Sequence, residues 1–136
     1  MQEQLSRVLV VVHDPEVSAF IGECLSPFTQ VPQQTTFVES LAQLRAQAET
    51  TLVQSPPDVL IFGDQYLAGE SGMDVLLTQV GGRSLYEVAQ GALFSSDAER
   101  PEIQHLYRPF NVGVFIPKPV TLERFQDLIG PLFRKK

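Results

Sequence analysis

The sequence predicts an α/β protein, a doubly wound sandwich in which helices cover both faces of one parallel sheet. The first observation is that short apolar runs alternate with segments of helical periodicity along the whole chain. The second is that these runs are apolar at nearly every position, which is typical of strands buried on both faces of a parallel sheet. Because crossovers between parallel strands are right-handed, five such strands and five helices form three layers.

Four of the five expected strands are clear from their composition. They are "VLVVV" at 8–12, "VLIFG" at 59–63, "GALF" at 91–94 and "VGVFI" at 112–116. The segment 29–38 is a weaker strand that contains Pro32, and a proline without an N–H donor suits the edge of a sheet.

The helices are expected from their start signals and their apolar spacing. Asp14 is a predicted N-cap with Pro15 at the first helical position, and apolar residues then recur on one face up to Leu25. Ser40-x-x-Gln43 resembles a capping box before a second helix. A third helix is expected on Met73, Leu76 and Leu77. The fourth, within 98–110, is expected to be short, irregular or mobile because Pro101 and Pro109 lie near its ends. The fifth carries the last apolar residues at helical spacing: Leu122, Phe125, Leu128, Ile129, Leu132 and Phe133.

Size and composition limit the classes of function. The 136 residues correspond to one domain, taken as 1–136, and the net charge of −6 disfavours general binding to nucleic acid or to a membrane. The single cysteine, Cys24, has no partner for an internal disulfide and is expected to be a core residue. With no signal peptide in the sequence, a cytoplasmic protein is expected.

Polar residues follow the expected strands at one edge of the sheet. In doubly wound folds the site lies beyond the carboxyl ends of the strands, and the residues there are 12–14, Asp64, Ser95 with Ser96, and Lys118. A carboxylate, a hydroxyl and a lysine suit phosphoryl transfer. Asp64 would be the nucleophile, the lysine would balance the developing charge, and the hydroxyl would donate to a phosphoryl oxygen.

These residues resemble the receiver domain of bacterial response regulators over nearly the whole chain. The segment "PDVLIFGDQYLAGESGMDVL" is similar to the phospho-acceptor segment of that family, with Asp64, Gly69 and Gly72 in step and Ala68 in place of the usual proline. The expected third strand carries one residue more between "PD" and the acceptor than the family generally has. "FIPKP" is similar to the end of the family's fifth strand, so Lys118 takes the place of its lysine, and a cis bond is expected before Pro119.

The resemblance implies further properties. They are a (βα)5 flavodoxin-like fold with strand order 2-1-3-4-5, Ser95 (or Ser96) as the switch hydroxyl, and Phe115 as the switch aromatic. It implies a signalling domain that is no enzyme beyond phosphorylation and dephosphorylation of its own Asp64. Its partners would be a sensor histidine kinase or a downstream effector protein, reached by protein contact through the fourth helix, fifth strand and fifth helix. No DNA-binding domain has room after Lys136, excision from a longer regulator remains open, and the oligomeric state is unknown.

The opening strand departs from the family pattern. Family members typically read "VLVVDDDPE", and the first two acids hold magnesium; here Val12 and His13 replace them. Magnesium prefers carboxylate oxygens, and imidazole suits softer metals. Asp64 and the backbone carbonyl of Tyr66 would be nearly the only ligands left, so Mg²⁺ is expected to bind weakly and phosphorylation to be weak or absent.

Most of these residues also have an ordinary structural interpretation. Asp14 fits an N-cap better than a ligand, Val12 fits the core, and His13 and His105 fit solvated positions. The serines can cap a strand end and an aspartate can begin a turn. Lys118 requires a carboxylate near it, and Asp64 is the expected partner.

Three functions remain open from the sequence. The first is a receiver that accepts a phosphoryl group on Asp64, and the second is a pseudo-receiver, an interaction module independent of phosphorylation. The third, an unrelated flavodoxin-like enzyme or nucleotide binder, is disfavoured because "HDPE" stands where a glycine-rich phosphate loop would follow the first strand.

Overall fold

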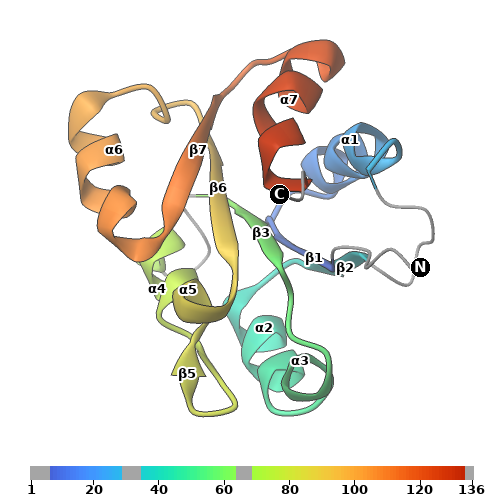
Figure 1. Cartoon of the computed structure of the whole chain (residues 1–136), viewed down its shortest axis with the longest axis vertical. Coiled ribbons are helices and arrows are strands. Elements are labelled where there is room, and N and C mark those ends of the chain that lie inside the picture. The colour runs from blue at the N-terminus through green and yellow to red at the C-terminus, as the bar shows by residue number, and fades with distance from the viewer. Residues whose placement is uncertain (1–6, 29–34, 64–68, 134–136) are drawn as a thin grey trace.

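A five-stranded parallel sheet forms the centre of the computed structural model, which describes residues 7–28, 35–63 and 69–133 (Figure 1). The strands lie in the order β2-β1-β3-β6-β7, and every neighbouring pair is parallel. Their bounds are β1 (Val8–Val11), β2 (Thr35–Val38), β3 (Val59–Phe62), β6 (Gln90–Ser95) and β7 (Val112–Pro117). This sheet confirms the predicted doubly wound α/β sandwich with strand order 2-1-3-4-5.

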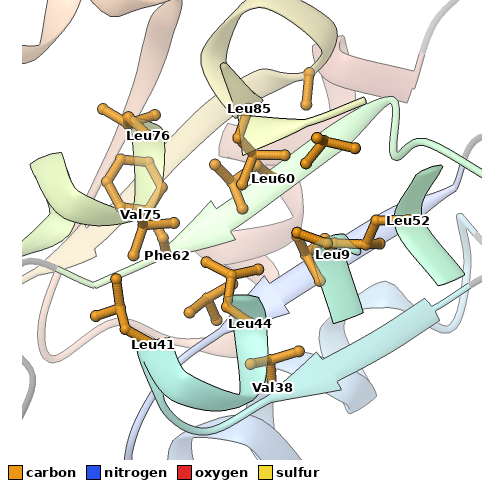
Figure 2. Packing of buried hydrophobic residues seen from close by; sticks show 14 of the residues in the cluster. Leu9, Val38, Leu41, Leu44, Leu52, Leu60, Phe62, Val75, Leu76 and Leu85 are labelled. Carbon is orange, nitrogen blue, oxygen red and sulfur yellow. The ribbon is translucent and has the colours of Figure 1, made fainter. Parts of the chain in front are cut away.

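Alternate residues of the strands belong to two separate cores, as expected for a sheet buried on both faces. In β3, Leu60 and Phe62 lie in the first core, and Val59 and Ile61 lie in the second. Figure 2 shows the first core, where the helices on that face bring their leucines against the sheet.

Two helices cover the second core and five short ones lie over the first. Helices α1 (Pro15–Leu25) and α7 (Leu122–Ile129) lie side by side over the second core (Figure 1). The first core is covered by α2 (Leu41–Ala48), α3 (Thr51–Gln54), α4 (Gly72–Leu76), α5 (Leu85–Val88) and α6 (Pro101–Tyr107). None of the helices in the described part of the chain has the length and apolar character needed to cross a bilayer.

The helix starts follow the predicted capping signals. The Asp14 side chain accepts a hydrogen bond from the Glu16 backbone N–H at 2.9 Å, and Pro15 is the first residue of α1. The Ser40 hydroxyl accepts from the Gln43 N–H at 3.1 Å, while the Gln43 side chain accepts from the N–H of Glu39 rather than from that of Ser40. The Asp14 and Ser40 side chains therefore each accept a hydrogen bond from a backbone N–H that has no partner within the first turn of its helix.

The strand ends were predicted to within a residue or two where they can be compared. Only 35–38 of the weak strand expected at 29–38 forms a described strand, and Pro32 lies outside the described residues. The fourth strand includes one more residue at each end than "GALF", and the fifth extends to Pro117.

The segment between β3 and β6 differs from the single third helix that was predicted. Helix α4 ends at Leu76, and Leu77, expected on its apolar face, is exposed. A hairpin of β4 (Gln79–Val80) and β5 (Arg83–Ser84) follows, and then α5. Gly81 and Gly82 form its turn with φ values of 62° and 88°, a left-handed pair that glycine adopts without a steric penalty.

The fourth predicted helix is short, as expected. Helix α6 (Pro101–Tyr107) has seven residues and continues into the single 3-10 turn η3 (Arg108–Phe110) before Asn111, whose φ is 66°. The turn η4 (Gly130–Phe133) likewise follows α7. A proline at each end of the segment limits the α-helix to two turns.

Candidate functional site

The residues after β1 are buried and apolar first, then polar and exposed. Val12 is 4% exposed and belongs to the second core, which confirms it as a core residue. His13 is exposed, and so is Asp14, whose carboxylate caps α1. The backbone N–H of Val12 donates to the Val38 carbonyl at 3.1 Å, so the end of β1 is tied to the end of β2.

This end of β1 does not fit a magnesium ion. Magnesium takes oxygen ligands in an octahedral arrangement, but Val12 supplies no side-chain oxygen and His13 supplies imidazole nitrogen. Asp14 Oδ1 already accepts a hydrogen bond from the Glu16 N–H. Across the described ranges, no cluster of three or more His, Cys, Asp or Glu side chains could hold a metal ion.

Two predicted ligand positions, Asp64 and the backbone of Tyr66, lie outside the described residues. Strands β1 and β3 end on the paired residues Val11 and Phe62, so Val12 and Gly63 are the next residues of the two strands. Gly63 is buried.

Polar side-chain contacts are found in the chain after this segment. Glu70 forms an ion pair with Arg45 of α2, with 3.0 Å between the carboxylate oxygen and the guanidinium nitrogen. The backbone N–H of Ser71 donates to the Asp74 carboxylate at 2.8 Å, which completes a capping box at the start of α4.

Of the two candidate switch hydroxyls, Ser95 is the one at the strand end. Ser95 is 1% exposed, and its hydroxyl accepts a hydrogen bond from the Asp97 N–H at 3.0 Å. Its carbonyl accepts from the Lys118 N–H at 3.3 Å, which joins the ends of β6 and β7. Ser96 is exposed. The structure thus brings Ser95 and the Lys118 backbone together.

The Lys118 ammonium lies 5.1 Å from the ring centroid of Phe94, within the range of a cation–π contact. Phe94 belongs to the second core, where Phe20 and Phe125 pack against its ring. The peptide bond between Lys118 and Pro119 is cis, as expected. The expected pairing of Lys118 with Asp64 involves a residue outside the described ranges and stays a prediction.

Phe115, the predicted switch aromatic, is half-buried and packs against the first core. It is the register partner of Leu93, and the Arg108 guanidinium lies over its ring at 5.3 Å. The contacts of Arg108 with Phe115 and of Lys118 with Phe94 were not predicted, because the sequence alone does not show which ring a cation will lie over.

The two other residues that the sequence placed away from a site are where they were expected. His105 is exposed on α6. Cys24 is buried in the second core, and burial, with a smaller contribution from the Glu23 charge, raises the pKa of its thiol to about 11. A thiol of this kind is a core group rather than a nucleophile.

Comparison with known proteins finds similarity in structure and not in sequence. No family model matches the chain, and no curated protein is similar to it in sequence. A chemotaxis response regulator of Vibrio cholerae superposes with a TM-score of 0.72 at 14% identity, over 95% of this chain and 99% of that one. The non-phosphorylated HemR receiver domain of Leptospira biflexa gives 0.66 at 16% identity, over 96% of each chain.

A third solved structure extends the same result. The phosphorylated cyanobacterial phytochrome response regulator RcpA gives a TM-score of 0.64 at 20% identity, over 94% of this chain and 91% of that one. The matched fraction is nearly complete in all three pairs, and the strand order is the one expected for such domains. The chain therefore has the fold of the receiver domains of response regulators.

Proposed function

We propose that the chain is a receiver-type module of a two-component phosphorelay, with Asp64 at the phospho-acceptor position and weak or no magnesium-dependent phosphorylation. The observation that carries this proposal is the end of β1 in a receiver fold. Val12 is buried in the core and His13 is exposed at the two positions where the family has its acidic ligands. Ser95 and Lys118, by contrast, lie at the strand ends where the family has its hydroxyl and its lysine.

The proposed output is contact with another protein, and the partners are a sensor histidine kinase or a downstream effector. The surface for it is formed by α6, β7 and α7, which follow one another along the chain beside the sheet edge (Figure 1). The module would be cytoplasmic and would catalyse nothing beyond the phosphoryl chemistry of its own Asp64.

A second candidate, a pseudo-receiver whose contacts do not depend on phosphorylation, is favoured by the same β1 end. A phosphoryl donor that approaches a carboxylate needs its charge compensated. Neither Val12 nor His13 supplies a carboxylate to hold a cation for that purpose.

Incubation with acetyl phosphate or phosphoramidate and magnesium tests the proposal, with intact mass as the readout. We expect little or no gain of a phosphoryl group by the wild-type chain. The matched variants are Asp64→Asn, which removes the acceptor, and Val12→Asp/His13→Asp, which restores both acids. His13→Asp alone adds an exposed acid without disturbing the core.

The outcomes separate the candidates. A phosphoryl gain in the restored variant that disappears on Asp64→Asn supports a degenerate receiver with an intact acceptor. No gain in any folded variant favours the pseudo-receiver. Rapid, magnesium-dependent phosphorylation of the wild-type chain contradicts the interpretation of Val12 and His13.

A further inference from the structure

Helix α6 is attached to the rest of the molecule through one buried side chain. The structure describes all seven residues of α6, and among them Tyr107 alone is buried, with 3% of its surface exposed. Its ring packs edge-on against Phe62, the last residue of β3, with 5.8 Å between the ring centroids. Ile103 is half-buried against the same core, whereas Leu106 is 51% exposed.

The Tyr107 ring also reaches the start of α4. Gly72, the first residue of α4, has no room for a side chain. A Cβ atom there would lie 2.6 Å from the Gly63 carbonyl oxygen, 2.8 Å from Phe62 Cε2 and 2.9 Å from Tyr107 Oη. Three elements meet at this point: the end of β3, the start of α4 and the end of α6. The space at Gly72 is thus too small even for a methyl group, so a side chain there would push against all three elements.

Gly63 and Gly72 stand on either side of the segment that contains Asp64. The chain leaves the sheet at Gly63 and enters α4 at Gly72, and Tyr107 lies against Gly72 and beside Phe62. Directly after Tyr107, Arg108 stacks on Phe115 of β7. One continuous set of contacts therefore runs from the two ends of this segment to α6 and the edge strand.

We infer that Tyr107 is a positioning residue that couples the placement of α6 to the junction of β3 and α4. A shift of Gly72 changes the space available to the Tyr107 ring, and because that ring is the buried attachment of α6, the helix shifts or loosens with it. Conversely, removal of the ring leaves a cavity beside Gly72 and loosens α4. Packing gives this coupling whether or not Asp64 accepts a phosphoryl group.

Amide hydrogen exchange, read by mass spectrometry on peptides that cover α4 and α6, tests this coupling in both directions. Gly72→Ala perturbs the junction, and we expect the exchange of α6 amides to rise by about tenfold or more. Tyr107→Leu perturbs α6, and we expect a comparable rise in α4. Tyr107→Phe removes the Oη atom nearest Gly72 but keeps the ring against Phe62, so we expect a smaller rise than in Tyr107→Leu.

Matched controls distinguish coupling from general destabilisation. Gly113→Ala adds the same methyl group where nothing lies within 4 Å of it. Leu106→Ala shortens the exposed residue next to Tyr107. Neither control should change the exchange of α4, and the α1–α7 layer should remain protected in every variant.

The inference is overturned if Gly72→Ala loosens α4 but leaves α6 at wild-type exchange, or if Tyr107→Leu loosens α6 alone. It is also overturned if Leu106→Ala has the same effect on α4 as Tyr107→Leu. Should Gly72→Ala fail to fold, the comparison of Tyr107→Leu with Leu106→Ala decides the question by itself.

Discussion

Replacement of Asp14 by alanine distinguishes a helix cap from a metal ligand. Asp14 Oδ1 accepts a hydrogen bond from the Glu16 N–H at 2.9 Å, with Pro15 at the first helical position. Loss of an N-cap side chain costs about 1 kcal/mol. Loss of a negative charge at a helix N-terminus costs about 0.5 kcal/mol. We therefore expect Asp14→Ala to lower the free energy of unfolding by about 1.5 kcal/mol, and Asp14→Asn by only about a third of that.

Urea denaturation followed by circular dichroism, with and without excess magnesium, measures this cost. A ligand at a hundredfold its dissociation constant stabilises a folded protein by about 2.7 kcal/mol. Since the Asp14 carboxylate is already used as a cap, we expect the cost of Asp14→Ala to be the same in both buffers. If magnesium stabilises the wild-type chain on this scale, and the gain disappears in Asp14→Ala, then Asp14 is a ligand and the reasoning is refuted.

Three further predictions are checked by the same urea denaturation experiment. Asn111 combines a φ of 66° with side-chain hydrogen bonds to the Tyr86 carbonyl in α5 and the Ala89 carbonyl just after it, so Asn111→Ala should cost about 2 kcal/mol and Asn111→Gly less. Arg45→Ala removes an exposed ion pair with Glu70 and should cost less than about 1 kcal/mol; a larger loss would contradict the small contribution expected of such pairs. Folding raises the pKa of Cys24 from 9.0 to about 11, so its contribution is constant at lower pH, because the thiol is then protonated in both states. Between the two values only the unfolded chain loses the proton, so stability should fall by up to about 1.4 kcal/mol per pH unit. Cys24→Ala should lack this fall, and an equal fall in that variant would contradict the assignment.

The sheet could be predicted from the sequence because its strands carry their own signal. A run such as "VLVVV" is apolar on both faces, and few environments other than a covered parallel sheet accommodate it. The hairpin after α4 could not be predicted in the same way, because each strand has two residues and shows no alternation. Its one local signal is Gly81-Gly82, a pair that favours a tight turn.

In the candidate site, too, some features could be predicted from the sequence and others could not. Local chemistry predicted the Asp14 cap and the burial of Val12, since each depends on neighbouring residues, whereas the cis bond at Lys118-Pro119 was expected from the resemblance of "FIPKP" to the receiver family. The contact of Tyr107 with Gly72 joins residues 35 positions apart in the printed sequence, and the Phe94 ring under Lys118 lies on another strand. Such contacts depend on how the elements pack, which periodicity does not specify.

Val12 packs in the core at the end of β1, where the resemblance to receiver domains predicts a carboxylate, and this separates the stability of the fold from the phosphoryl chemistry proposed for it. Carboxylates gathered at one sheet edge repel one another unless a cation or a lysine balances them. Val12 avoids that repulsion, and burial of a valine side chain contributes about 1.5 kcal/mol or more without any ion. The Lys118 ammonium lies over Phe94, whose ring is part of the same core. The strands are built by one set of residues and the chemistry of a receiver is supplied by another, at the strand ends. A chain can therefore lose the second set and keep the sheet, together with the surface of α6, β7 and α7 that the sheet supports.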